Sequence, residues 1–387
     1  LPEFMKAKPL VETIANTIEG VDVVPSGWLC PWAETTQPAV LAGMYESCSS
    51  SPNFDRESNP AACDGEIITT EMVRKLVGLP EDYCLLKNGL GRVVPCEGEA
   101  ILLSFIACKH SRPKAKQYNL VPLGLPEQSP LRKCLIIHNC IEFGPGIKFD
   151  VESLQIAIDQ LNSNSKRPHL LYQQISCIAD IERVSSLKPL LKQNEIFLYT
   201  DCSLLGLHAI EYSTSLSTME SDFYYFNFGP TLGTPLSSGI LFMRDRRPLK
   251  EVINNPHQEY LEVAHEDKPR SGINANITMI EYNAPDYDIG FTNAVYWSGT
   301  FFSMIYYGKE GLHNILKRHT ASLKILFDEI SKLDIPWERR PELKPNCIEF
   351  TLENDDPKNL YSPIELNKSI IESALDFVSG LPCRSIL

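Results

Sequence analysis

The middle of the chain alternates between short apolar runs and stretches in which apolar residues recur at helical spacing. Helical spacing marks residues 151–161 and 181–192. The runs that we expect to form strands are 134–137, 169–172, 195–201, 223–226 and 239–243. Strands that alternate with helices are typical of a mainly parallel sheet covered on both faces, so this pattern predicts an α/β fold.

The two flanking regions follow other patterns. Residues 5–65 are rich in prolines and turn formers, and we expect an irregular segment there. Further helices are predicted at 71–76, 97–109, 294–307, 312–333 and 362–377, and a further strand at 346–352. We therefore expect three parts, which are the irregular segment 5–65, a large α/β domain at 66–310 and a small α+β domain at 311–387.

Composition narrows the function classes. The net charge of −13 over 387 residues opposes binding to nucleic acid and to anionic membranes, and no apolar run reaches the length of a membrane span. The twelve cysteines form no CxxC pair, and many lie in apolar runs, which indicates buried reduced thiols rather than a metal site. With no secretory signal pattern, we expect a cytoplasmic protein without a bound metal.

One acid follows a strong strand signal and begins the chemically informative part of the sequence. Residues 196–200 are followed by Asp201-Cys202-Ser203, and residues 221–239 read SDFYYFNFGPTLGTPLSSG. This block resembles the group II pyridoxal-phosphate (PLP)-dependent amino-acid decarboxylases of fold type I, which include the aromatic amino-acid, glutamate and histidine decarboxylases. The resemblance implies a PLP-transferase-like large domain. The match through this block has no gap, and it places Gly229 and Pro230 where the family has a histidine and the Schiff-base lysine.

Other segments match the family more loosely. Residues 97–100, with the sequence EGEA, resemble the start of the phosphate-binding helix, but with an extra carboxylate that would repel a phosphate. The run 136–138 resembles the strand that ends in the ring-stacking histidine, and Thr292 occupies the place of an arginine. The resemblance implies cofactor contacts at Asp201, His138, Ser203, Gly98, Glu99, Asn227 and Thr231.

Each candidate also has a purely structural interpretation. Asp201 could cap the next turn, and Glu99 could be an acid that the helix dipole favours. His138 could be a hydrogen-bonded interior histidine, and Pro230 an ordinary loop proline.

Three functional hypotheses follow from this comparison. The first is a pseudoenzyme that keeps the decarboxylase scaffold to bind a protein partner or a small ligand, because proline has no amine and cannot form an aldimine; no cofactor is then expected. The alternative is an atypical decarboxylase, a carboxy-lyase, that binds PLP non-covalently around Asp201. A third is a different chemistry in the same cleft, for which no catalytic triad is readable. The resemblance also implies a homodimer.

Overall fold

The structure, a computed structural model, describes residues 37–48, 60–111, 119–126, 130–137, 143–164, 166–232, 234, 239–253, 296–332, 337–343, 345 and 348–352. The chain divides into two compact units. The first contains Trp32–Thr320 and Lys344–Asn346, and the second contains Leu1–Pro31, Ala321–Leu343 and Cys347–Leu387.

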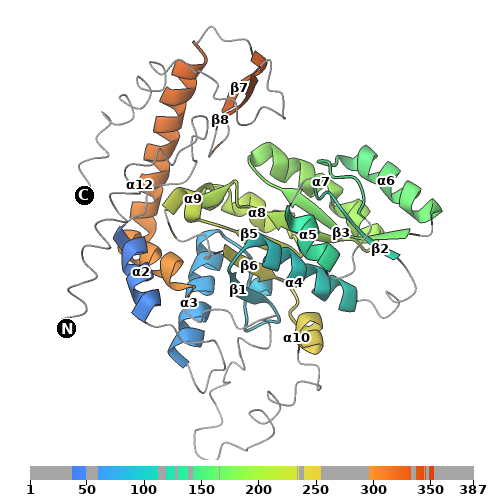
Figure 1. Ribbon diagram of the computed structural model, residues 1–387, viewed down its shortest axis with the longest axis horizontal. Coiled ribbons are helices and arrows are strands. Elements are labelled where there is room, and N and C mark those ends of the chain that lie inside the picture. Colours follow the sequence, from blue (N-terminus) through green and yellow to red (C-terminus); the bar gives the residue numbers. More distant parts are fainter. Residues whose placement is uncertain are drawn as a thin grey trace, which may run out of the picture. The chain divides into compact units, whose positions relative to one another are not determined.

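A six-stranded sheet forms the centre of the first unit (Figure 1). Its strands lie in the order β1-β6-β5-β4-β3-β2. Strands β2, β3, β4 and β5 run parallel to one another. Strand β6 is antiparallel to both of its neighbours, β5 and β1. The bounds are β1 Leu90–Val94, β2 Asn119–Leu123, β3 Lys166–Gln174, β4 Phe197–Asp201, β5 Phe223–Phe226 and β6 Gly239–Met243. The predicted α/β fold with a mainly parallel sheet is confirmed.

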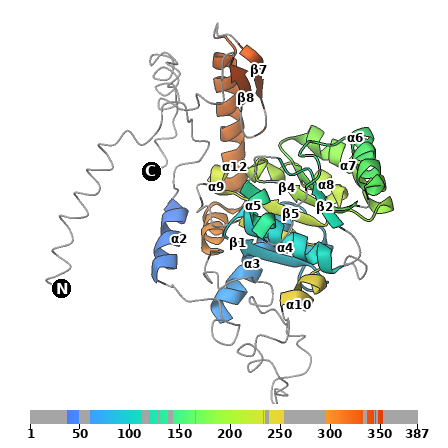
Figure 2. The ribbon, with the colours of Figure 1, turned by 45° about the vertical axis from the view of Figure 1, so that its right-hand side comes forward.

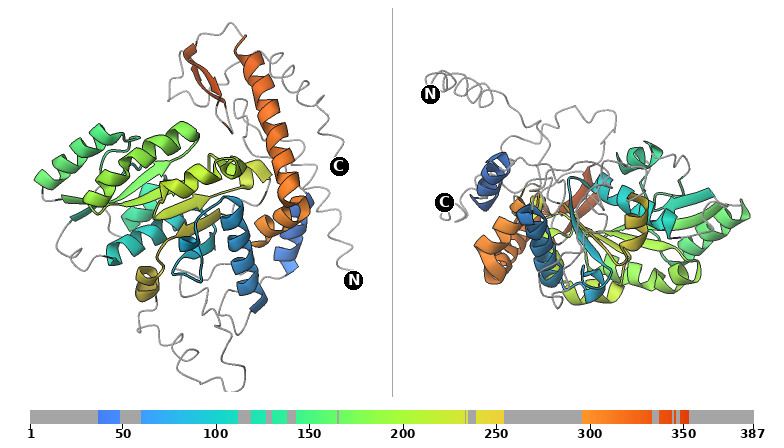
Figure 3. Two further views of the ribbon diagram at one scale, coloured as in Figure 1. Left: turned by 180° about the vertical axis from the view of Figure 1, so that it is seen from behind. Right: turned by 90° about the horizontal axis from the view of Figure 1, so that it is seen from below.

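Helices cover both faces of this sheet, as Figures 1 to 3 show from several sides. Successive strand residues point to opposite faces, so neighbours such as Tyr224 and Tyr225 enter different cores. The face of Tyr225 packs against α4 (Glu97–His110), α5 (Pro130–Ile137) and α10 (Arg247–Ile253). The face of Tyr224 packs against α6 (Val151–Ser163), α7 (Ile178–Gln193) and α8 (Ser213–Met219).

Two helices lie inside the segment that was expected to be irregular. The structure shows α2 at Gln37–Cys48 and begins α3 (Pro60–Leu76) at Pro60, so the expectation for residues 5–65 is wrong wherever that segment is described. Helix α2 buries the small Ala39 and Ala42, and its Tyr45 contacts aromatic rings of the first unit. Small residues among prolines resemble turn sequence, which explains the error.

The run at 134–137 was also assigned wrongly. It lies in helix α5, whereas the neighbouring strand β2 lies earlier, at Asn119–Leu123. A four-residue apolar run does not distinguish a buried strand from a turn of buried helix. The predicted strand leading to His138 is therefore absent, and His138 itself lies outside the described residues.

The last described helix is α12, Ser298–Ile330, in which Gly308 has non-helical angles (φ 59°). This break matches the two separate helices predicted around it. In the second unit, β7 (Trp337–Leu343) pairs antiparallel with β8 (Ile348–Leu352), which confirms the strand predicted at 346–352 and adds a partner that was not predicted. The predicted helix at 362–377 lies outside the described residues. No helix in the described part of the chain is long and apolar enough to cross a membrane.

Short elements complete the first unit. They are the 3-10 helices η1 (Glu81–Tyr83) and η3 (Gly206–Ile210) and the one-turn helix α9 (Gly229–Leu232).

Candidate functional site

Asp201 is the last residue of β4 and is fully buried. It pairs in register with Gln174 on β3 and with Tyr225 on β5. Directly paired residues of neighbouring strands point to the same face, so all three side chains lie on the face covered by α4. Gln174, Asp201 and Tyr225 therefore form a row of polar side chains near the carboxyl ends of three adjacent strands.

The carboxylate of Asp201 is hydrogen-bonded entirely by this chain. Its Oδ2 accepts from the Gln174 amide at 2.9 Å and lies 2.9 Å from the Tyr172 hydroxyl. Its Oδ1 accepts from the backbone N–H of Ser203 at 2.8 Å. Asp201 and Ser203 were predicted from the sequence, and the structure brings them together, whereas the roles of Tyr172 and Gln174 were not predicted. Alternate residues of a strand point to one face, so the spacing of two between Tyr172 and Gln174 indicates in the sequence that they share a face.

Glu97, the first residue of α4, is the second acid at this place. Its Oε1 lies 2.9 Å from the Tyr172 hydroxyl, so the tyrosine bridges Glu97 and Asp201. Burial, and then the nearby charge of Asp201, raise the pKa of Glu97 to about 8. A phenol has one proton and donates it to one acceptor. The second contact therefore requires a proton on a carboxyl group, and a protonated Glu97 supplies it.

Aromatic rings fill the space beside the two acids. Tyr172 stacks on Tyr199 with 5.5 Å between ring centroids and 18° between ring planes. A Cβ added to Gly239 would lie 2.5 Å from the Tyr225 hydroxyl, so that ring packs directly against the backbone of β6. Burial, followed by the nearby carboxylates, raises the pKa of all three tyrosines, and burial likewise raises the pKa of the Cys202 thiol.

The first turn of α4 carries the residues predicted to bind a phosphate. Gly98 is buried and Glu99 is half-buried. The cap residue Cys96 makes no side-chain cap hydrogen bond, and Glu97 and Glu99 place two acids in this turn. An ionised acid there interacts favourably with the helix dipole but opposes a phosphate, which needs the same N–H groups, whereas the protonated Glu97 carries no such charge.

The lysine position of the family falls in α9. The side chain of Asn227 accepts a hydrogen bond from the backbone N–H of Gly229 at 2.9 Å, so it caps its own turn. Pro230 and Thr231 belong to this helix, but their side chains lie outside the described residues, as does Thr292. The sequence contains no lysine between Lys192 and Lys250. The assignment of Pro230 to the lysine position stays a prediction.

The chain is similar to known proteins in both sequence and fold. No protein-family model matches it. It is 24% identical over 362 residues to tyrosine decarboxylase 2 of Arabidopsis thaliana, an alignment that covers 86% of this chain and 64% of the relative. The fold is similar to that of Catharanthus roseus tryptophan decarboxylase, with a TM-score of 0.69, 19% identity and coverage of 89% of this chain and 75% of that one. The chain is therefore similar in sequence to a tyrosine decarboxylase and in fold to solved amino-acid decarboxylases.

Two further solved structures share the decarboxylase fold. Rhodiola rosea 4-hydroxyphenylacetaldehyde synthase matches with a TM-score of 0.69 and 18% identity, over 94% of this chain and 79% of that one. Mouse CSAD matches with a TM-score of 0.64 and 14% identity, over 86% and 70%. The chain spans 64% of the length of the tyrosine decarboxylase that it matches.

The residues of this chain fit PLP poorly, although a matched structure, the Oryza sativa TDC, contains PLP. In the family, the strand-end acid bonds the pyridine nitrogen of the cofactor. Here Tyr172, Gln174 and Ser203 already occupy both oxygens of Asp201. The first turn of α4, to which the resemblance assigns the phosphate, contains Glu97 and Glu99.

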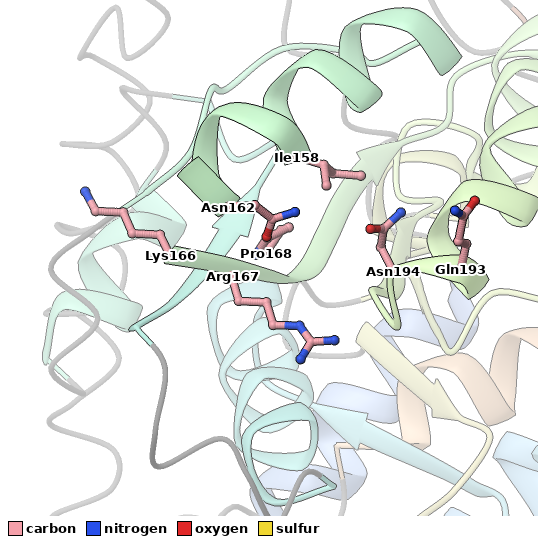
Figure 4. Close-up of a pocket in the computed structure, with 7 residues that line it drawn as sticks. All are labelled: Ile158, Asn162, Lys166, Arg167, Pro168, Gln193 and Asn194. Carbon is pink, nitrogen blue, oxygen red and sulfur yellow. The ribbon is translucent and has the colours of Figure 1, made fainter. Parts of the chain in front are cut away.

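A surface hollow of about 260 Å³ lies at the amino end of β3, where α6 and α7 end (Figure 4). Its cations do not converge, because the side chains of Lys166 and Arg167 point in different directions and Arg167 pairs with Glu195 at 2.9 Å. The hollow contains none of the predicted site residues. Its lining residues are Ile158, Asn162, Lys166, Arg167, Pro168, Gln193 and Asn194.

Proposed function

We propose that this chain keeps the decarboxylase fold without PLP chemistry and acts as a pseudoenzyme that binds a partner or a ligand. The observation that carries the proposal is the closed hydrogen-bond set around Asp201. Both carboxylate oxygens accept from groups of the chain itself, and the acid is fully buried. An acid in this state has no accessible oxygen to keep a pyridine ring protonated.

The absence of lysines from this part of the sequence supports the same proposal. An internal aldimine needs a lysine near the ring, and the stretch from residue 193 to residue 249, which includes β4, β5 and β6, contains none. The resemblance assigns the position of the family lysine to Pro230, which has no side-chain amine. The absence of an amine and the hydrogen bonds around Asp201 are separate observations, and each opposes PLP chemistry.

The test is a titration of the purified chain with PLP, followed in the visible aldimine band, by borohydride reduction and by mass spectrometry. An active decarboxylase treated in parallel is the positive control. We expect no aldimine band and no reduced pyridoxyl adduct on the wild-type chain, and no carbon dioxide from aromatic amino acids. A specific borohydride-fixed adduct on a lysine of the wild type would overturn the proposal.

The variants Pro230→Lys and Tyr172→Phe, alone and together, show which change matters more. If both changes block the cofactor, only the double variant gains an aldimine band. An aldimine in Pro230→Lys alone would show that the closed site around Asp201 is no barrier to PLP.

A non-covalent PLP enzyme is the alternative, and the place of Asp201 at the carboxyl end of β4 favours it. Equilibrium dialysis with PLP separates the two proposals. Saturable binding that is lost in Asp201→Asn would establish the alternative, whereas equal weak retention by both proteins would support the pseudoenzyme.

A further inference from the structure

A buried histidine and a half-buried histidine meet in the first unit. His208 lies in η3, with 1% of its surface exposed, and His319 lies on α12. The Nε2 atom of His208 is 3.3 Å from Nδ1 of His319, and the ring centroids are 5.6 Å apart. This contact joins two elements that are more than one hundred residues apart in sequence.

Glu211 determines the direction of the hydrogen bonds. Its Oε2 lies 3.1 Å from Nδ1 of His208, and a carboxylate only accepts, so Nδ1 of His208 carries a hydrogen. In a neutral His208 the Nε2 atom is then an acceptor, so Nδ1 of His319 is the donor. The three side chains form one chain of hydrogen bonds that ends at Nε2 of His319.

Apart from Glu211, the described neighbours on α12 and beside Glu211 offer little compensation for added positive charge. One turn before His319, α12 presents the apolar Ile315 and Leu316, and its cations Lys317 and Arg318 are exposed. On the other side, Glu211 lies near Tyr212, which in turn lies near Cys177 at the start of α7, and both of these groups are neutral in their usual forms. Burial, and then His208, lower the pKa of His319.

We propose that Glu211, His208 and His319 form an acid-sensitive latch between η3 and α12. A first proton at Nε2 of His319 leaves the bond from Nδ1 intact but places a cation at a half-buried position. A second proton, on His208, removes its acceptor, so that two N–H groups face each other across 3.3 Å. Contact between η3 and α12 is then lost.

The direction of the pH dependence follows from linkage. A histidine with a lowered pKa in the folded state stabilises fully above its unfolded pKa of about 6.5, and this stability falls as the pH drops below that value. The latch is therefore closed at neutral pH and opens in acid.

Hydrogen exchange measured by mass spectrometry tests the latch in the intact chain. After correction for intrinsic exchange, we expect peptides covering 206–211 and 312–320 to exchange about tenfold faster at about pH 5.5 than at about pH 7.5, while β4 is unchanged. His319→Gln keeps an amide donor without a titrating group and should abolish this difference. The control His313→Gln, on the same helix, should keep it. Equal exchange at both pH values in the wild type, or an undiminished difference in His319→Gln, would overturn the latch.

Glu211→Gln gives a second test that does not depend on how His319→Gln folds. Removing the negative charge makes protonation of the pair harder, so the midpoint of the exchange transition should move to lower pH. A purely structural contact predicts no movement of the midpoint, and that result would also count against the latch.

Discussion

Replacement of Glu97 by glutamine is the sharpest test of the acid pair at the candidate site. Glutamine has nearly the shape of a protonated glutamic acid but does not titrate. In the wild type, the pKa of Glu97 rises to about 8 on folding, mainly because of burial, from about 4.3 in the unfolded chain. The folded protein therefore binds a proton more tightly than the unfolded one.

The sign and size of the effect follow from this shift. The stability that Glu97 contributes is fully present below its unfolded pKa and is lost as the pH rises through its folded pKa of about 8. Between these values the loss approaches about 1.4 kcal/mol per pH unit for one group. The free energy of unfolding of the wild type should fall by roughly 3–4 kcal/mol between about pH 5 and about pH 8 from this group.

Urea unfolding at a series of pH values, followed by far-ultraviolet circular dichroism, measures this slope. Glu97→Gln should have a much flatter profile and should exceed the wild type in stability at about pH 8. Glu99→Gln, two residues further along α4, should keep the wild-type slope. Parallel profiles for the wild type and Glu97→Gln would refute the shared proton between Glu97, Tyr172 and Asp201, and so would an equal flattening in Glu99→Gln.

Three other predictions concern packing and assembly. Tyr172→Phe keeps the stack on Tyr199 but removes the bridging hydroxyl, and we expect a loss of about 2 kcal/mol in urea unfolding, with a change under about 0.5 kcal/mol counting against the bridge. Gly239→Ala should cost about 1–3 kcal/mol because its Cβ would lie 2.5 Å from the Tyr225 hydroxyl, and the cost should shrink in a Tyr225→Phe background. The homodimer stays a prediction, and sedimentation velocity checks it. Helix α2 exposes the apolar Leu41 and Met44, so if this face joins the copies, Leu41→Asp should yield monomers.

Continuous apolar runs explain how much of the fold was predictable. Strands β3 to β6 contain such runs, and all four were predicted. Strand β1 was missed because Gly91 and Arg92 interrupt its apolar pattern, although Arg92 is buried in the fold. Strand β2 was missed because Pro122 stands inside it, at an irregularity in its pairing with β3.

Prediction of the candidate site from the sequence was limited for a different reason. Asp201 was predictable because it directly follows a strong strand signal. Its contacts with Gln174 and Tyr172 depend on the register between β3 and β4, which pairs Gln174 with Asp201. Local pattern specifies which residues of a strand share a face, but not which residue of the neighbouring strand lies opposite.

The thiol beside the acid provides a native reporter for this region. Cys202 follows Asp201 directly and is fully buried, and its raised pKa keeps it in the unreactive thiol form. An alkylating reagent can modify it only when the carboxyl end of β4 opens to solvent. Cys96, exposed at the start of α4, is an internal reference that reacts without any opening. The ratio of the two labelling rates, read residue by residue in a mass spectrometer, therefore measures how often the interior around Asp201 becomes accessible to a small molecule, in the unaltered protein and without an engineered probe.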